Sequence, residues 1–147
     1  MAELDFNALS EDVTGILAKE GKMVLATSSG DRVTARTINH VNDGPDIYFG
    51  TSNLSCKYQQ LIANPNVAIV IGGMQIEAVA APCGHPGDNA ELWKQYHAKF
   101  PHLAGAYPSR PDDVVIKCTP QKIVLFRYIG GAVWDTLDLV EKKAYRQ

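Results

Sequence analysis

The chain has 147 residues, with 14 lysines and arginines against 16 aspartates and glutamates, and 46% of its residues are hydrophobic. This length fits a single domain spanning 1–147 that buries enough apolar surface to fold without disulfides or metals. The slightly acidic balance argues against nucleic acid as a partner, because binding to a phosphate backbone requires a basic surface.

The apolar residues near the N-terminus recur at helical spacing and predict a helix from about 10 to 20. Ser10 begins a sequence typical of a helix cap, and Gly21 is a natural stop. We therefore expect an N-terminal helical segment over 1–21.

Three short strands follow, joined by turns rich in Gly, Asp and Asn. Connections of this length join antiparallel neighbours, whereas parallel strands need a long crossover. The next segment predicts a short helix that Pro65 ends. The predicted strands cover 23–28, 32–41 and 46–51, and the helix covers 55–64.

The second half begins with the nearly all-apolar segment 67–71, which predicts a strand buried on both faces. Asp88 is the expected N-cap of a second amphipathic helix that carries Leu92, Trp93, Tyr96 and Phe100. These aromatic residues are typical of a packing stripe, with a lid over a ligand as the alternative. The remaining predicted elements are a strand at 74–82, the helix at 88–100, a proline-rich loop at 101–111, strands at 114–119 and 122–128, and a tail at 132–147 of undecided role.

Six or seven antiparallel strands with two or three short flanking helices indicate a mainly β, α+β fold of the small-barrel type. The chain lacks a GxGxxG that opens a helix and a GxxxxGK[ST] motif, so neither a Rossmann nor a P-loop protein is expected.

Three widely spaced cysteines without a CxxC pair predict reduced thiols and a cytoplasmic protein. The acidic N-terminus differs from a signal peptide. No apolar run approaches the roughly 20 residues that a membrane-spanning helix needs, so no membrane partner is expected. His40, His85, His97 and His102 form no metal-binding pattern.

One stretch points to a ligand. Arg36 lies on a predicted strand, Thr51 and Ser52 end the next strand, and Lys57 opens a predicted helix. Cations, hydroxyl donors and a helix N-terminus together are typical of a site for a phosphate monoester.

The same segments occur in an order that resembles the pyridoxamine 5'-phosphate oxidase-like superfamily, the FMN-binding split β-barrels. The shared features are Arg-x-Ile at Arg36, an Asp-Gly turn, an aromatic-x-Thr ending at Thr51, a lysine six residues later, and a helix ending in Asn64-Pro65. Two strands, Met23–Ser28 and the one that ends in Thr119-Pro120, also match. The chain looks closest to the general stress protein branch.

This resemblance implies a split barrel and a homodimer with FMN in a groove between the subunits. It assigns cofactor binding to Arg36, Thr37, Ile38, Thr51, Ser52, Lys57 and Gln75. Arg36, Thr51, Ser52 and Lys57 would hold the phosphate or ribityl group, the main chain after Arg36 would face the isoalloxazine ring, and Gln75 would lie beside the flavin. It identifies no catalytic residue.

Two departures from the family pattern concern the ligand. Cys56 stands where the family often has an arginine, so one phosphate cation is missing. The C-terminal Trp and Arg of the vitamin B6 oxidases have no clear counterpart, although Arg127 and Trp134 lie in that region. These departures weaken the case for pyridoxamine phosphate as substrate more than the case for FMN.

The resulting hypothesis is an FMN-dependent oxidoreductase that passes hydride or electrons through the flavin. The alternatives are a non-catalytic FMN-binding or sensor protein, a relative that binds haem or a deazaflavin, and a structural protein with an empty groove. A hydrolase is not expected, because no Ser-His-Asp or Cys-His arrangement is readable. Neither the substrate nor the electron donor can be read from the sequence.

Overall fold

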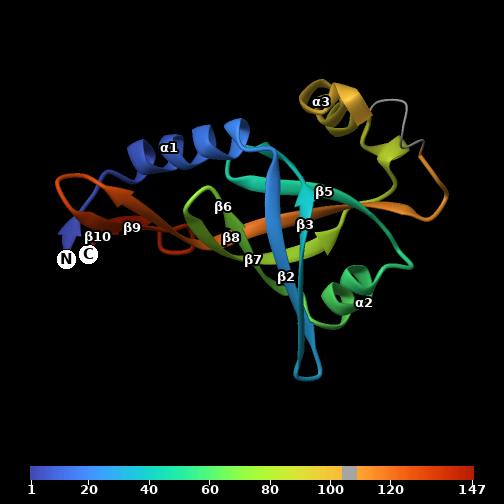
Figure 1. Cartoon of the computed structure of the whole chain (residues 1–147), viewed down its shortest axis with the longest axis horizontal. Helices are drawn as coiled ribbons and strands as arrows, with labels where there is room; N and C mark the ends of the chain where they lie inside the picture. The colour runs from blue at the N-terminus through green and yellow to red at the C-terminus, as the bar shows by residue number, and fades with distance from the viewer. Residues whose placement is uncertain (104–108) are drawn as a thin grey trace.

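A computed structural model describes residues 1–103 and 109–147, and within them ten strands form one antiparallel sheet with three α-helices around it (Figure 1). This confirms the predicted mainly β, α+β fold. The strands are β1 Ala2–Glu3, β2 Lys22–Ser29, β3 Arg32–Asn39, β4 Val41–Asp43, β5 Asp46–Ser52, β6 Asn66–Ile71, β7 Met74–Pro82, β8 Asp113–Tyr128, β9 Ala132–Asp138 and β10 Lys143–Arg146.

The helices are α1 Phe6–Lys19, α2 Cys56–Ala63 and α3 Ala90–Lys99, with 3-10 turns η1 Pro86–Asp88 and η2 Pro101–Leu103 on either side of α3. Residues 104–108 of the predicted loop 101–111 lie outside the described residues. None of the described helices is long and apolar enough to cross a membrane.

Two predicted helix starts are wrong. The first helix begins at Phe6 rather than near residue 10, because the Asp5 carboxylate accepts a hydrogen bond of 2.8 Å from the backbone amide of Ala8 and caps it there. Asp88 does not cap the third helix: it ends η1, and α3 begins only after Asn89. Ser55, the first residue of the predicted helix 55–64, caps α2: its hydroxyl accepts a hydrogen bond from the backbone amide of Tyr58.

The strand order is β1-β10-β9-β8-β7-β6-β2-β3, with β5 attached to β8 and β4 to β5. Among the described strands, β3 and β5 do not pair, so the barrel stays open between them. Predicted site residues lie on both strands that border this opening, Arg36 to Ile38 on β3 and Thr51 and Ser52 on β5. A ligand that contacts both strands would therefore lie in the opening.

Strand β8 is continuous from Asp113 to Tyr128, which corrects the prediction of two strands separated at Pro120-Gln121. Its pairing with β7 shifts register between Glu77 and Ala78, opposite Pro120. This irregularity accommodates a proline that has no N–H to donate. The long strand thereby pairs with β5, β7 and β9 and ties the two halves of the sheet together.

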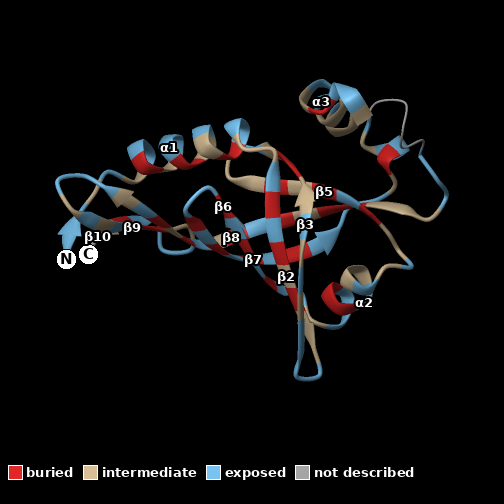
Figure 2. Ribbon diagram, in the orientation of Figure 1, coloured by how far each residue is buried: buried red, intermediate tan, exposed pale blue. Residues whose placement is uncertain are grey.

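The core lies between the inner face of the sheet and α1, whose buried face points toward the strands (Figure 2). Leu9, Val13 and Leu17 are the buried residues of α1. The expectation that residues 67–71 are buried on both faces is wrong: the strand alternates, and Val70 is 51% exposed. The outer face of the sheet therefore presents apolar side chains.

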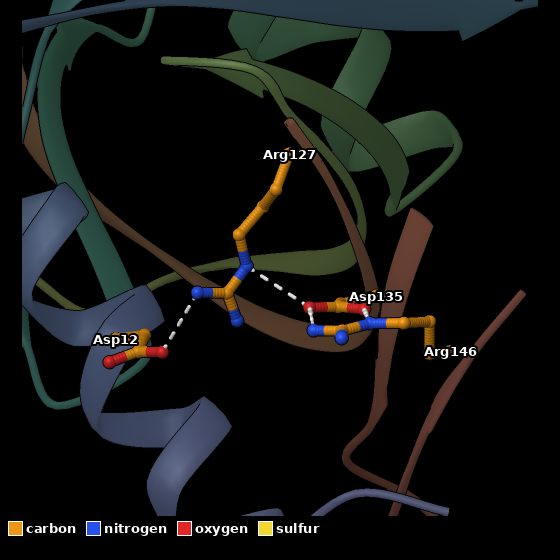
Figure 3. Close-up of polar contacts among 4 residues, drawn as sticks. All are labelled: Asp12, Arg127, Asp135 and Arg146. Atoms are coloured by element: carbon orange, nitrogen blue, oxygen red, sulfur yellow. Dashed lines mark hydrogen bonds and ion pairs between the residues drawn. The ribbon is translucent and has the colours of Figure 1, made fainter. Parts of the chain in front are cut away.

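The predicted tail 132–147 is part of the sheet. It forms β9 and β10, and β1 pairs with β10, so the two termini lie side by side (Figure 1). The buried Asp135 carboxylate joins this hairpin to the rest of the chain (Figure 3). It accepts hydrogen bonds from Arg146 at 2.7 and 2.9 Å and from Arg127 at 3.0 Å, and Arg127 also reaches Asp12 on α1.

Candidate functional site

A groove of about 460 Å³ lies in the opening of the barrel between β3 and β5. Residues from both strands, the first turn of α2, one face of α3 and the loop before β8 line it. They include Ile38, Asn39, Gly50, Thr51, Ser52, Lys57, Pro86, Trp93, Tyr96, Arg110 and Asp113. Three segments distant in sequence thus meet at one concave site.

Two cations lie close together beside this groove: Lys57 lines it, and Arg36 is near Lys57 without being part of the lining. Partial burial lowers the pKa of Lys57, and the nearby positive charge of Arg36 lowers it further. Burial also lowers the pKa of Arg36. Within residues 1–103 and 109–147, no carboxylate lies within ion-pair distance of either side chain. A pair of mutually repelling, uncompensated cations favours an anionic ligand.

Arg36 is held by uncharged acceptors. Its Nη1 donates to the Thr27 hydroxyl at 2.8 Å and to the Leu25 carbonyl at 3.2 Å, and its Nη2 donates to the Thr34 hydroxyl. These bonds fix the guanidinium against β2 and β3. Because no partner is charged, the positive charge of Arg36 remains available to a ligand.

The two predicted hydroxyl donors have different environments. The Thr51 hydroxyl lies 3.0 Å from that of Ser55, beside the start of α2. The Ser52 hydroxyl donates to Asp112 at 2.5 Å, and this bond lowers the pKa of Asp112. Thr51 is therefore better placed than Ser52 to donate to a ligand.

Thr37 and Gln75 do not join this group. Thr37 pairs with Val24, Val24 with Val70, and Val70 with Gln75, so all four side chains form one row across the sheet. All four are exposed, on the face opposite the core. The seven predicted residues thus divide into two groups. Ile38, Thr51, Ser52 and Lys57 line the groove, with Arg36 on the same face of β3 as Ile38. Thr37 and Gln75 lie on the outer face.

Helix α3 supplies an aromatic wall of the groove. The rings of Trp93 and Tyr96 are stacked, with centroids 5.1 Å apart and planes 3° from parallel, and both line the groove. No residue of α3 itself is buried, but Phe100, which ends the stripe, is 7% exposed and packs against Tyr96 with ring centroids 5.0 Å apart. The stripe therefore packs at its C-terminal end and lines the groove through Trp93 and Tyr96. In the sequence, the helical spacing of Trp93 and Tyr96 is the pattern that could indicate that both rings line the groove. Arg110, also in the lining, carries no signal in the sequence.

The four histidines, all of them described by the structure, form no cluster that could hold a metal ion. No group of three or more His, Cys, Asp or Glu side chains in the described parts of the chain is arranged to hold a metal ion. His40 is fully buried, its Nε2 lies 3.1 Å from the Leu17 carbonyl, and burial lowers its pKa to about 4, with the charge of Lys99 contributing. A buried neutral imidazole of this kind is a structural element.

Comparisons with known proteins agree with this fold. The sequence profile described as "Pyridoxamine 5'-phosphate oxidase" matches residues 9–126. No curated protein matches the chain.

Three solved structures illustrate the shared fold. A putative pyridoxamine 5'-phosphate oxidase from Listeria innocua is 24% identical over 78% of this chain and 95% of its own, with a TM-score of 0.66. General stress protein 26 from Bacillus anthracis is 22% identical over 78% and 91%, with a TM-score of 0.64. A haem storage protein from Vibrio cholerae is 14% identical over 80% and 91%, with a TM-score of 0.62. At these identities the likeness concerns the fold.

Proposed function

Since the chain belongs to the pyridoxamine 5'-phosphate oxidase family, we propose that it is a flavoprotein that binds FMN in the groove between β3 and β5. We further propose that it is an oxidoreductase. The observation that carries this proposal is the pair Arg36 and Lys57: Lys57 lines the groove, Arg36 lies close to Lys57, and in the described residues neither has a carboxylate within ion-pair distance. The phosphate of FMN carries a charge of about −1.5 to −2 and would compensate both.

The groove residues fit such a cofactor. Lys57 and Arg36 would bind the phosphate, and the Thr51 hydroxyl and the N-terminus of α2 would donate hydrogen bonds to it. Trp93 and Tyr96 would cover the groove and exclude water from it. When bound, the flavin supplies the hydride or electron transfer, and the protein contributes binding and orientation.

We also propose a homodimer that forms through the outer face of the sheet. This face carries a row of exposed side chains in which Val24 and Val70 are 39% and 51% exposed. An exposed apolar sheet face is a costly surface for a monomer. Thr37 and Gln75 lie in the same row, so they can contribute to a flavin site only if a second copy packs against this face.

A Val70→Lys variant tests the dimer. We expect a monomer by light scattering and a loss of FMN affinity, because a charge in the centre of the interface opposes association. A Val140→Lys variant is the control, since Val140 is 63% exposed in the turn between β9 and β10, outside this row. If the unmodified chain is itself a monomer, this interface is wrong.

The proposal for the cofactor is tested by the visible spectrum of the purified protein, recorded before and after addition of FMN and desalting. A retained flavin spectrum supports the site, and bleaching by a reduced nicotinamide under anaerobic conditions supports the oxidoreductase. A flavin that stays oxidised with every donor would favour the non-catalytic alternative. A colourless protein that releases added FMN would contradict the proposal, and a Soret band would favour haem.

A further inference from the structure

Beneath the Arg36 side chain lies a buried amide that no part of the proposed function uses. Gln60 on α2 is 6% exposed. Its Oε1 accepts hydrogen bonds from the hydroxyls of both Thr27 and Thr34, each at 2.5 Å. Gln60 also lies three residues after Lys57, so both side chains are on the same side of the helix. The amide therefore connects the helix that carries one cation to the strands that carry the other.

The two threonine hydroxyls face Gln60 and Arg36 at once. Their oxygens accept from Arg36 Nη1 and Nη2, while their hydrogens are donated to Gln60. A hydroxyl has one hydrogen and two lone pairs, so a hydrogen committed to Gln60 leaves the lone pairs for the arginine. The Gln60 carbonyl thereby fixes the polarity of both hydroxyls and keeps their acceptor sides toward Arg36.

The chemical type of residue 60 also has a consequence. A carboxylate in this place would orient the same hydroxyls, but it would bring a full negative charge close to Arg36 and Lys57. A neutral amide orients the hydroxyls without that charge. The neutrality of Gln60 therefore leaves the field of the two cations available in the groove.

We propose that Gln60 is a positioning residue for the anion site: through Thr27 and Thr34 it holds Arg36 in place, and because it is uncharged it preserves the affinity of the site for a phosphate group. This inference rests on the proposed function and adds to it the network that maintains the charge of the site. Gln60 itself does not line the groove and is not expected to contact the ligand.

A comparison of two variants, Gln60→Glu and Gln60→Met, tests the proposal. Glutamate nearly preserves the shape and the acceptor, whereas methionine removes the acceptor and stays neutral. If the role of residue 60 is only to pack and to hydrogen-bond, the glutamate variant should be the milder one. If its neutrality matters, the glutamate variant should be the more severe one, and only toward ligands with a phosphate.

The measurement is a fluorescence titration of the full chain with FMN and, separately, with riboflavin, which lacks the phosphate. We expect Gln60→Glu to weaken FMN binding at least 10-fold and Gln60→Met about 3- to 5-fold, with riboflavin affinity changed less than 2-fold in both. We also expect the dependence of FMN affinity on salt to be shallower in Gln60→Glu, because the site then has a smaller net charge.

Several results would overturn the proposal. These are FMN affinity within 2-fold of the unmodified chain in Gln60→Glu, a milder effect of glutamate than of methionine, or equal losses of FMN and riboflavin. An unmodified chain that binds no FMN would instead overturn the proposed function, and this inference with it. Should Gln60→Glu not fold, Thr34→Val removes the hydroxyl that accepts from Arg36 Nη2. This variant should weaken the affinity for FMN about 3-fold or more and leave the affinity for riboflavin unchanged. An unchanged FMN affinity would overturn the inference.

Discussion

Two clusters of basic side chains in this protein differ in how their charge is compensated. At the C-terminal hairpin, Arg127 and Arg146 both donate to Asp135, which is fully buried between them (Figure 3). Beside the groove, Arg36 and Lys57 lie close together, and no carboxylate in the described residues is within ion-pair distance of either. The first cluster is compensated within the chain, and the second has no ion-pair partner in the described residues.

The difference indicates what each cluster does. The Asp135 carboxylate, held between two arginines, links β8, β9 and β10. Arg127 also binds Asp12 and so links these strands to α1. The first cluster therefore contributes to the stability of the folded chain. Two uncompensated cations cost free energy in the empty protein, because they repel each other and are partly desolvated. That cost is recovered when an anion binds, so the second cluster is typical of a binding site.

The largest expected effect is at the compensated cluster. Asp135→Asn leaves two arginines without their carboxylate and should lower the free energy of unfolding by about 2–4 kcal/mol, somewhat below a wholly buried pair because both arginines reach solvent. Urea denaturation measures this loss. Asp12→Asn is the control: Asp12 is 53% exposed, so its loss should be about 1 kcal/mol or less. Equal effects of the two variants would contradict the assignment.

At the groove cluster the expected effect is on the ligand. Lys57→Ala should weaken FMN binding by about 1.5–3 kcal/mol, the scale of a charge-assisted hydrogen bond. The stability of the ligand-free protein should stay the same or rise, because the substitution removes a repulsion between cations. A flavin fluorescence titration measures the affinity, with Lys19→Ala on the exposed face of α1 as the control. An unchanged dissociation constant would remove Lys57 from the site.

Acid should weaken the C-terminal cluster by a smaller amount. The hydrogen bonds from Arg146, with the charges of Arg146 and Arg127, hold the pKa of Asp135 below its usual value despite burial. A depressed carboxyl pKa gives stability that is present above the unfolded value, about 3.9, and is lost as the pH falls through the folded value. The difference in unfolding free energy between the unmodified chain and Asp135→Asn should therefore be smaller at pH 3 than at pH 7. A constant difference would contradict this.

The smallest expected effect is that of salt concentration, which should act differently on FMN binding at the groove and on the stability that Asp135 provides. Raising the salt concentration should weaken FMN binding by a few-fold, because the groove is open to solvent and its charges are screened. The difference in stability between the unmodified chain and Asp135→Asn should change much less, because that carboxylate is buried. A similar salt dependence at both clusters would mean that they are not physically different.

Local sequence determined several parts of this protein. Turns of Gly, Asp and Asn set the antiparallel β2–β3 and β4–β5 connections, because only short tight turns fit there. Ser55 before an apolar-faced segment fixed the start of α2, since a serine hydroxyl satisfies a free amide of the first turn. The order of Arg36, Thr51 and Lys57 predicts an anion site, and the structure places Thr51 and Lys57 at one groove with Arg36 near Lys57.

The tertiary structure decided what depends on contacts distant in sequence. Pro120 lies within a continuous strand because the pairing of β7 with β8 shifts register next to it. Residues 132–147 form strands because β8 offers them a free edge. Thr37 and Gln75 fall on the outer face since side chains alternate along a strand, and only the pairing of β3, β2, β6 and β7 aligns them. Arg36 donates hydrogen bonds to Thr27 and Thr34, whose hydroxyls in turn bind Gln60. No local sequence pattern shows that these residues lie close together. Local propensities fix turns and caps, whereas the compensation of a charge depends on which groups the whole fold brings near it.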